Sequence, residues 1–586
     1  MIALFVLPAL TLFAVVLLYP MISALAYSLF EWGGGTRLVG FNWFANFVTL
    51  FTERPFTVQL PNALWNNIVL FLGTLILQNT IGLFLAVQLD RLPFRRVFQV
   101  LYTTPYLVSP LVVGYLWTLL LSPSFGPVNA ALRTIGLDAL ALPWLGNPKL
   151  ALPTLVLVSV WQWIGFPVLL YGAGLAGIPP ELHEAANLDG AVGLRQFWHV
   201  TLPLLVPVIG TVSILTYIGS MESFALPYAL GGVSGSPAGA TDVLSLLFFR
   251  TSFQSGAPNA LGVSSALATI MFVLVIAGAL IGRRLFARQE ARNLVSTVLL
   301  DPVQGSSPTR WPRGRRAVWG SVVAVLLCGY AAISVIPLVT MILNSFRTHL
   351  AIATEPWPWP ADPTLQNYVN AWTKASFSSY TVNSLTITIA SVALSTIVAL
   401  PAAYAVARWR FRGRELLEAL FISGLFIPFM LAILPMFHLM DALRLIDNPL
   451  SLVLVYAANG IPFSVFVFAA FFRQLPLDLE EAAMIDGAGP IRSFFAVSVP
   501  LVRPAIATVV VFRFVPIWND FLTPLVLLRS PERFTLGVGL SKFFGEYQTD
   551  WASLFAGLVI ATIPLLVLFI VATKQIITGI TAGIGK

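Results

Sequence analysis

The sequence predicts an all-α polytopic membrane protein built from two homologous six-helix modules, arranged as a parallel pseudo-two-fold repeat. Hydrophobic residues make up 58% of the chain, charged residues make up 10%, and the mean hydropathy is +0.86. Soluble domains carry about 25% charged residues, so this composition is typical of a membrane protein. One polar segment occurs twice, 297 residues apart, which indicates two joined modules.

About 12 apolar runs are long enough to cross a bilayer, which takes roughly 20 residues in a helix. In the first half they are 3–29, 66–89, 97–121, 150–174, 205–229 and 260–282. In the second half they are 317–343, 379–407, 415–440, 450–472, 504–528 and 553–577. The first run is too long for the core of a cleaved leader and lacks a small-residue cleavage pattern, so we expect a spanning helix there.

The basic residues predict the orientation of the spans. With a cytosolic N-terminus, the inward loops hold 21 of the 33 Lys and Arg residues, the outward segments hold 11, and Arg513 lies inside a span. This bias agrees with the positive-inside rule. It places both termini and both copies of the repeated segment in the cytosol, and it explains the net charge of +8 without a nucleic-acid partner.

The same pattern divides the chain into two modules and a linker. The first module is 1–285 with the repeated segment at 179–207, and the second is 317–586 with the repeat at 476–504. Residues 286–316, rich in Arg, Ser and Pro, are expected to form a flexible cytosolic linker. Parallel repeats of this kind suit a transporter whose pathway lies between the halves.

The repeated segment is the first candidate functional site. Its copies read PPELHEAANLDGAVGLRQFWHVTLPLLVP and PLDLEEAAMIDGAGPIRSFFAVSVPLVRP, identical at 14 of 29 positions. Each predicts a short helix that begins at proline, a turn at Asp-Gly and a second amphipathic helix. A single copy would be explained by interfacial helices that anchor a loop, whereas two copies favour docking to a two-fold cytosolic partner. The shared residues are Glu184, Ala185, Ala186, Asp189, Gly190 and Ala191 in the first copy and Glu481, Ala482, Ala483, Asp486, Gly487 and Ala488 in the second.

The fifth span of each half is the second candidate site, a substrate path. In the first half, Thr216, Ser220 and Ser223 share one helical face, with Tyr217 and Glu222 beside it. Hydroxyls between membrane helices also serve packing, so this alternative stays open. At the matching place, the second half carries Arg513, Trp518, Asn519 and Asp520. Charged groups within spans tend to face cavities or partners, and an indole beside polar groups suits a sugar ring.

Arg513 has two interpretations. It lies about 14 Å into its span from Pro504, too deep for easy snorkelling to the interface. One hypothesis is a structural ion pair with Glu222 or Asp520. The other is recognition of an anionic substrate, such as a phosphorylated polyol or a uronic acid.

The motif EAAxxDGA, followed about a dozen residues later by Leu/Val-Pro, resembles the cytoplasmic loop of the permease subunits of bacterial ABC importers, in the carbohydrate (maltose and glycerol-phosphate type) group. The first half resembles one permease of such systems in SPSFGPVNAAL, SVWQWIGFPVLLYGAGLAGIPPELHEAANLDGA and FFRTSFQSGAPNALGVSSALA. The second half resembles the other in NSLTITIA, AAYAVARWRFRG, WNDFLTPLVLL, TDWASLFAG and ITGITAGIGK. The resemblance implies that Glu184 to Ala191 and Glu481 to Ala488 dock on nucleotide-binding subunits and transmit ATP-driven closure.

Three features depart from that family pattern. The two permeases are fused in one chain here, and Arg513 stands where a small polar residue is usual. The chain also begins almost directly in its first span, so its start is expected to be truncated or misassigned.

The sequence also predicts which partners the chain needs. It has no G-x-x-x-x-G-K-[ST] loop to hold nucleotide phosphates, so we expect a permease rather than an enzyme, with no cofactor of its own and with ATP-Mg on two separate ABC nucleotide-binding subunits. The resemblance adds an extracytosolic solute-binding protein, a carbohydrate or polyol substrate, membrane lipid around the spans and a bacterial inner-membrane location, with no nucleic acid. The four histidines have no metal-ligand spacing, and Cys328 is expected to be a small core residue.

Two other classes of function were weighed against the importer. An ion-coupled carrier with twelve spans would explain Asp90-Arg91 and Arg95-Arg96, but it would not need a duplicated docking loop. A polytopic membrane enzyme would need clustered carboxylates, histidines or metal ligands near one membrane face, which the sequence does not show.

Overall fold

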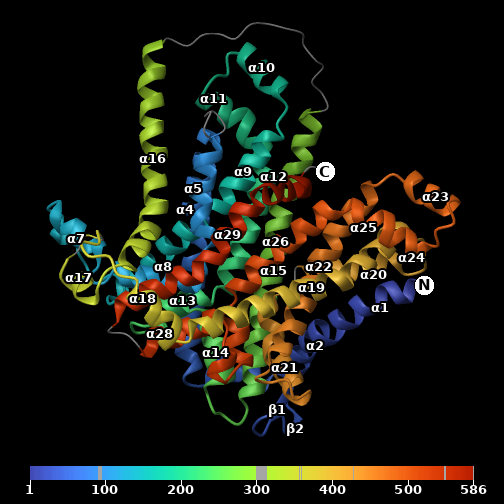
Figure 1. The fold of residues 1–586 in the computed structure, drawn as a ribbon, viewed down its shortest axis with the longest axis horizontal. Coiled ribbons are helices and arrows are strands. Elements are labelled where there is room, and N and C mark those ends of the chain that lie inside the picture. Colours follow the sequence, from blue (N-terminus) through green and yellow to red (C-terminus); the bar gives the residue numbers. More distant parts are fainter. Residues whose placement is uncertain are drawn as a thin grey trace. The chain divides into compact units, whose positions relative to one another are not determined.

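The computed structural model describes residues 1–89, 95–297, 313–355, 357, 359–425, 428–546 and 550–584. Its regular structure is almost entirely helical (Figure 1), as predicted. Within the described residues the strands are β1 (Phe30–Trp32) and β2 (Leu38–Phe41), which pair antiparallel as one hairpin. Asn46 supports this hairpin because its side-chain amide donates to the carbonyl oxygens of Ser28 and Phe30, at 2.9 and 2.8 Å.

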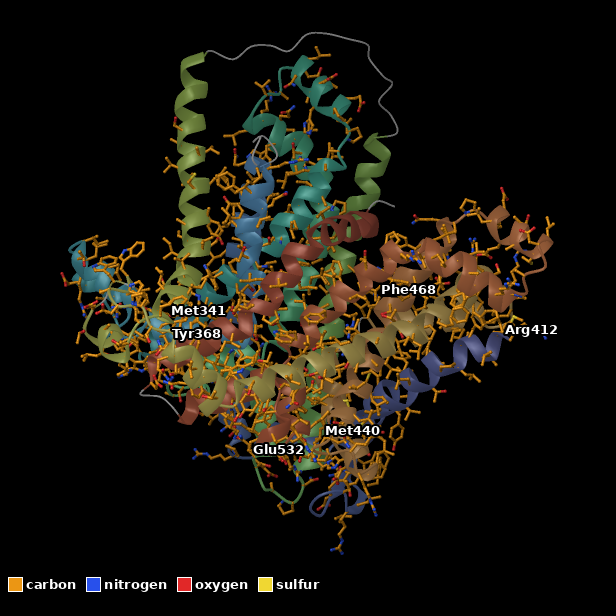
Figure 2. All side chains as sticks on the ribbon, in the orientation of Figure 1. Met341, Tyr368, Arg412, Met440, Phe468 and Glu532 are labelled. Atoms are coloured by element: carbon orange, nitrogen blue, oxygen red, sulfur yellow. The ribbon has the colours of Figure 1, made fainter. Side chains whose placement is uncertain are left out.

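One compact unit contains Met1–Leu60, Leu247–Val273 and Leu365–Gly579. Its N-terminal span consists of α1 (Ile2–Phe13), the π-helical turn η1 (Ala14–Leu18) and α2 (Tyr19–Tyr27). This span packs against three helices of the second sequence module, α19 (Phe377–Arg408), α21 (Phe429–Ala442) and α22 (Pro449–Gln474). The core between α19 and α22 includes Phe468, which is fully buried (Figure 2).

The remaining elements of this unit lie around that core. They are α3 (Ala45–Thr52), α18 (Gln366–Val369), η4 (Asn370–Lys374), α20 (Arg414–Ser423), α23 (Asp478–Ile485), α24 (Pro490–Ser493), η5 (Phe494–Ser498), α25 (Val499–Leu501), α26 (Arg503–Asn519), α27 (Leu522–Leu527), η6 (Pro531–Arg533), α28 (Leu536–Glu546) and nearly all of α29 (Trp551–Ile584).

The other unit contains Pro61–Leu246, Leu274–Thr364 and Ile580–Lys586. Here the first helix of the second module, α16 (Arg313–Asn344), packs on helices of the first module, chiefly α5 (Arg95–Leu107) and α6 (Pro110–Leu120). Two polar anchors hold it. The Tyr102 hydroxyl donates to the Leu327 carbonyl oxygen, and the Trp161 indole N–H donates to that of Ile333, both at 2.9 Å. Each module therefore contributes its first helix to the unit that holds most of the other module.

The rest of this unit follows the first module. Its elements are α7 (Pro127–Thr134), η2 (Asp138–Leu140), α8 (Pro148–Trp163), α9 (Gly165–Ala176), α10 (Pro180–Leu188), α11 (Leu194–Gln196), η3 (Phe197–Thr201), α12 (Leu202–Glu222), α13 (Ala225–Gly231) and α17 (His349–Thr354). Four helices have residues in both units: α4 (Phe56–Leu89), α14 (Leu244–Phe253), α15 (Ala260–Thr297) and the end of α29.

Most predicted spans agree with the structure except where the chain bends, but 205–229 and 504–528 extend past the ends of α12 at Glu222 and α26 at Asn519. Among the described residues, eight helices are long and apolar enough to cross a membrane, or up to eleven when each bent pair counts as one span. The predicted spans 97–121 and 150–174 are such pairs, bent by 94° and 46°, and a 71° bend precedes α26. The sharpest of these bends lies at Ser109-Pro110, since proline cannot continue the hydrogen bonding of a preceding helix.

The predicted span 415–440 is not one helix. It divides into α20 and α21, and Gly424 and Pro428 lie at their adjoining ends, where both residue types favour helix termination. The prediction for Cys328 is wrong, because this residue is exposed on α16. An apolar residue in a membrane helix faces lipid as readily as protein. Of the predicted linker, residues 298–312 lie outside the described residues, while α15 continues to Thr297 and α16 begins at Arg313.

Candidate functional site

The first copy of the repeated segment folds as a short helix followed by a left-handed turn. The helix α10 has Pro180 in its first turn and ends at Asp189. Gly190 has a φ of +72°, a conformation that glycine adopts without strain. The turn closes as the Ala191 N–H donates to the Ala186 carbonyl oxygen at 2.8 Å. This is the helix and turn that the sequence predicts.

The second copy has the same geometry on α23 (Figure 1). Gly487 has a φ of +79°, and the Ala488 N–H donates to the Ala483 carbonyl oxygen at 2.9 Å. The two turns therefore agree in conformation and in hydrogen bonding at equivalent positions. The repetition extends from the sequence to the backbone.

Both short helices present charged and apolar side chains on their outer surface. The predicted coupling residues Glu184, Ala185, Asp189 and Gly190 are exposed, as are Glu481, Ala482, Asp486 and Gly487; Ala186 is buried, and Ala191, Ala483 and Ala488 are half-buried. Large apolar side chains accompany them, with Leu188 50% exposed and Ile485 87% exposed. Exposed apolar groups next to carboxylates are typical of a protein-docking surface.

The turns lead into π-helical segments at equivalent positions. These are η3 (Phe197–Thr201) and η5 (Phe494–Ser498), which are again 297 residues apart. In the first copy the helix is continuous from Leu194 to Glu222. The predicted second helix of the first copy is thus continuous with the fifth span. π-Helical turns are rare and occur often at functional sites.

A buried carboxylate beside the second copy was not predicted from the sequence. Glu480 is 7% exposed and accepts hydrogen bonds from the Tyr404 hydroxyl, from Nε of Arg408 and from Oγ of Ser498, at 3.0, 3.1 and 3.1 Å. In the repeat register the first copy has His183 here, so the repetition that revealed Glu184 and Glu481 gave no signal for Glu480. The only available signal was an extra acidic residue directly before the shared glutamate.

The hydroxyls of the polar stripe in the first half donate to carbonyl oxygens of their own helix, α12. Oγ of Thr216 donates to the Val212 carbonyl oxygen and Oγ of Ser220 to that of Thr216, both at 2.8 Å. The Ser220 carbonyl oxygen accepts from the side-chain amide of Asn67 at 2.9 Å. Beside the stripe, the Tyr217 hydroxyl donates to the Leu274 carbonyl oxygen at 2.7 Å.

At the end of α12, Ser223 and Glu222 are both half-buried. The Ser223 carbonyl oxygen accepts from Oγ of Ser245 at 2.5 Å. The predicted face of three hydroxyls therefore ends where α12 ends, because Ser223 already has an extended conformation.

The second-half residues lie at the end of α26. The Trp518 ring is 6% exposed, stacks on Phe514 with centroids 5.8 Å apart, and donates its indole N–H to the Ala561 carbonyl oxygen at 3.2 Å. The Asp520 carboxylate accepts from the Tyr456 hydroxyl at 2.9 Å, while Asn519 is half-buried beside it. The indole is thus packed within the helices rather than open as a platform.

Arg513 forms no ion pair with Asp520 in the described part of the chain. Its Nη2 donates weakly to the Tyr456 carbonyl oxygen at 3.4 Å, and its buried Nε has no hydrogen-bond partner among the described residues. The guanidinium lies against Gly460, where an added Cβ would be 3.0 Å from Nε. Of the two pairings predicted for Arg513, the one with Asp520 is therefore wrong, because that carboxylate is held by tyrosine. The other predicted partner, Glu222, belongs to the other compact unit, so the pairing of Arg513 with Glu222 stays a prediction.

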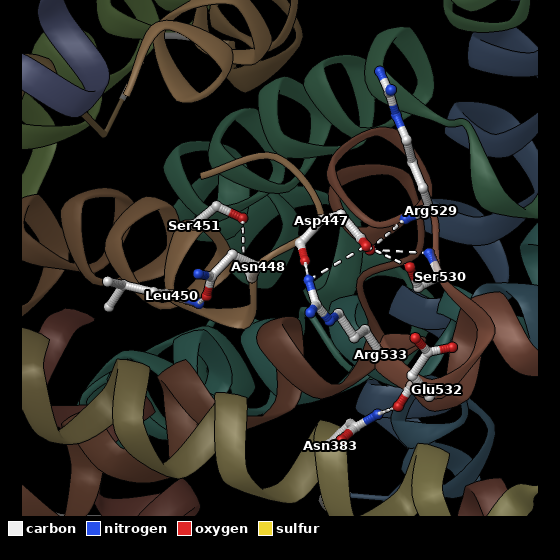
Figure 3. Close-up of polar contacts among 9 residues, drawn as sticks. All are labelled: Asn383, Asp447, Asn448, Leu450, Ser451, Arg529, Ser530, Glu532 and Arg533. Carbon is white, nitrogen blue, oxygen red and sulfur yellow. Dashed lines mark hydrogen bonds and ion pairs between the residues drawn. The ribbon is translucent and has the colours of Figure 1, made fainter. Parts of the chain in front are cut away.

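A third polar cluster surrounds Asp447, between α21 and α22 (Figure 3). Its carboxylate accepts from the N–H groups of Arg529 and Ser530, both at 2.9 Å, from Oγ of Ser530 at 2.5 Å and from Nη1 of Arg533 at 3.3 Å. Burial raises the pKa of Asp447, but these hydrogen bonds and the charge of Arg533 outweigh it, so the pKa lies below its ordinary value.

In each module an asparagine of a long helix holds a loop from later in the chain. Nδ2 of Asn383 donates to the carbonyl oxygens of Glu532 and Phe534 (Figure 3), at 2.8 and 3.1 Å. Nδ2 of Asn66 donates to those of Gly239 and Asp242, at 3.0 and 2.8 Å. Each asparagine fixes the segment that leads into the next helix, α28 or α14. The two modules therefore share structure well beyond the repeated loop.

Comparison with known proteins agrees with this twofold organisation. The family model described as "Binding-protein-dependent transport system inner membrane component" matches the chain twice, at residues 78–292 and 374–581. The two matches together cover more than half of the chain.

Individual relatives each match a little under half of this chain. The diacetylchitobiose uptake system permease protein of Streptomyces coelicolor is 34% identical over 260 residues, 44% of this chain and 86% of its own length. The sulfoquinovosyl glycerol transport system permease protein of Agrobacterium fabrum is 33% identical, over 42% of this chain and 87% of its own. The trehalose transport system permease protein of Mycobacterium tuberculosis is 31% identical, over 46% and 98%.

A solved structure with a similar chain is a bacterial ABC transporter involved in the import of the acidic polysaccharide alginate. It is 25% identical, has a TM-score of 0.41, and is matched over 45% of this chain and 99% of its own. The two family matches and the two copies of the helix and turn lead to one conclusion. The chain belongs to the binding-protein-dependent ABC importer permeases of the sugar-transport group, with two permease modules fused in one multi-pass membrane polypeptide.

Proposed function

We propose that this chain is the transmembrane permease subunit of an importer for a carbohydrate or related polyol, driven by two separate nucleotide-binding subunits. The observation that carries the proposal is the exposed helix and glycine turn present twice, with Glu184 and Glu481 at equivalent positions. Two equal docking sites fit a pair of ATPase subunits. The names of the relatives, which refer to sugar uptake, support the substrate class.

In this proposal the chain carries no chemistry of its own and works by alternating access. A binding protein delivers the solute on the outer face. ATP closes the two nucleotide-binding subunits, which move α10 and α23 and open the pathway outward. Hydrolysis then resets it, and the solute leaves toward the cytosol, where both termini lie. Coupling requires only that the two states bind nucleotide with different affinity.

The decisive experiment is reconstitution with the ATPase and the binding protein encoded beside this gene. We expect one solute from a panel of neutral sugars, sugar phosphates and polyol phosphates to stimulate ATP hydrolysis. The combined Glu184→Lys and Glu481→Lys substitutions should abolish that stimulation, because both docking helices then carry the opposite charge. Glu415→Lys, an exposed glutamate in the first turn of α20, is the matched control and should keep it. An ATPase that neither binds the wild-type chain nor responds to solute would favour the ion-coupled carrier.

The substrate path is proposed along the fifth span of each half. It would use Thr216, Tyr217, Ser220, Glu222 and Ser223 in one module and Arg513, Trp518, Asn519 and Asp520 in the other. Because Trp518 and Ser220 are buried in helix packing, Arg513 is the residue of this set that tests the proposal most directly.

Arg513→Thr should reduce uptake of acidic solutes at least tenfold relative to neutral ones if the guanidinium binds an anionic substrate. The reason is that its Nε has no partner in the described protein, which leaves a buried donor for a ligand. Competition between a neutral and an acidic solute, measured in whole-cell uptake, gives the ratio directly. An unchanged ratio would discard the anionic substrate and leave Arg513 as a structural residue.

A further inference from the structure

The carboxylate of Glu480 lies at the base of the second docking helix. It comes from α23, one residue before the predicted coupling residue Glu481, but it points inward and is 7% exposed. Tyr404 and Arg408 reach it from the last turns of α19, and Ser498 reaches it from η5. Three donors from two other elements therefore converge on one buried anion.

Arg408 extends this cluster to a fourth element. Its side chain is 7% exposed, its Nε forms the ion pair with Glu480 at 3.1 Å, and its Nη2 donates to the Leu475 carbonyl oxygen at 2.8 Å. Leu475 is the residue at the end of α22. We call Tyr404, Arg408, Glu480 and Ser498 the buried clamp. It ties α19, the end of α22, α23 and η5 together.

Separation of the buried Glu480 carboxylate from the Arg408 guanidinium is energetically unfavourable. Removal of one partner of a buried ion pair strongly destabilises a fold because it leaves an uncompensated charge, whereas removal of both charges costs far less. Movement of α23 away from α19 would strand both the carboxylate and the guanidinium. The second docking helix and α19 are therefore expected to move as one body.

In the first docking helix, the residues that the structure describes, which leave out 90–94 after α4, show a different contact at this position. The residue in register with Glu480 is His183, which is half-buried. Its carbonyl oxygen accepts from Nε2 of Gln196 at 3.0 Å, a contact within the loop itself rather than to a membrane helix. The two copies thus share their docking surface but differ in the residue before the shared glutamate and in the contacts described there.

We propose that Glu480 and Arg408 are positioning residues that deliver the movement of the second docking helix directly into α19. The inference rests on the proposed function, since it assumes that an ATPase subunit moves α23. It adds residues outside the shared motif and assigns them to transmission rather than to docking.

The test uses the full chain, reconstituted with its ATPase and binding protein, and compares Glu480→Gln, Arg408→Gln and the double variant. Each single variant should lower the Tm and raise the ATP hydrolysed per solute imported at least threefold, while the ATPase still co-purifies. The double variant has no stranded charge, so its Tm should recover most of the loss. If the ion pair transmits movement, the double variant should still hydrolyse more ATP per solute imported than the wild type. A double variant that recovers both Tm and the wild-type ratio would overturn the proposal and leave the clamp merely structural.

Two further variants keep the result unambiguous. Glu418→Gln breaks the exposed pair that Glu418 forms with Arg473 at 2.6 Å between α20 and α22, and it should leave the ratio unchanged. An equal rise there would show that loss of any ion pair in this region uncouples transport, which contradicts the proposal.

Tyr404→Phe removes one hydrogen bond without stranding a charge and should give a smaller rise, even if the other variants fail to fold. A wild-type chain without solute-stimulated hydrolysis would instead refute the proposed function itself.

Discussion

At the scale of single residues, Asp447 gives a prediction about pH. Its folded pKa lies below its ordinary value of about 3.9, so its charge stabilises the fold above that value and the stabilisation is lost as the pH falls through the lowered pKa. Asp447→Asn should therefore lower stability at pH 7 by about 1 kcal/mol, since the cluster is partly exposed. The difference between variant and wild type should shrink toward pH 3.

Thermal unfolding in a non-ionic detergent at pH 7 and pH 3 measures this effect. Glu532→Gln is the matched control, because Glu532 is exposed in the same loop and contributes only its carbonyl oxygen to Asn383 (Figure 3). A loss that is equal at both pH values would show that the charge of Asp447 is not what stabilises the cluster.

The site residues that could be predicted from the sequence are those that occur in both copies of the repeated segment. Glu184 and Glu481 were found because both copies keep them, and their exposure agrees with that interpretation. Glu480 was missed because only one copy has it, and its partner Arg408 is 72 residues away. The pairing of Arg513 with Asp520 was wrong because no sequence pattern shows that Tyr456 occupies the carboxylate.

At the scale of elements, the paired π-helical turns give the next prediction. Deletion of the exposed residue Ala496 would convert η5 to an ordinary helical turn and rotate α23 by about 100° relative to α26. We expect stimulated ATP hydrolysis to fall at least tenfold, because the docking surface then faces another direction. Ala496→Ser keeps the length of the chain and should retain activity. The measurement is solute-stimulated ATPase activity in proteoliposomes, and full activity of the deletion variant would contradict a role for η5 in aiming α23.

Element boundaries were predictable wherever a span is straight. The predicted spans 379–407 and 450–472 agree with α19 and α22 to within a few residues. Bends were not predictable from hydropathy, because a broken span and a straight one have the same apolar content. Proline alone was insufficient as a signal, since α22 contains Pro462 and remains one helix while α5 and α6 separate at Pro110.

At the scale of the whole molecule, the exchange of first helices could not be predicted. Hydropathy locates α1 and α16 as spans but says nothing of which helices they contact. Between membrane helices close packing, rather than burial from water, decides association. In the first unit Phe13 of α1 fits against Gly424 at the end of α20, where an added Cβ would lie 2.8 Å from the Phe13 ring. Phe13 also packs on Phe421, with ring centroids 5.8 Å apart.

This exchange predicts that the two modules assemble even when they are separate chains. Residues 1–297 and 313–586, co-expressed, should co-purify through a tag on either piece, because each supplies a helix that packs within the unit of the other. Gly424→Val should reduce that recovery several-fold, since an added Cβ would lie 2.7 Å from Cγ of Pro462 on α22 and 2.8 Å from the Phe13 ring, which would displace α1. Gly329→Val on α16 is the control, as nothing lies within 4 Å of a Cβ there. If Gly424→Val leaves the recovery unchanged, the packing of α1 on the second module does not hold the modules together. If both variants lose recovery equally, the effect comes from the added side chain rather than from its position.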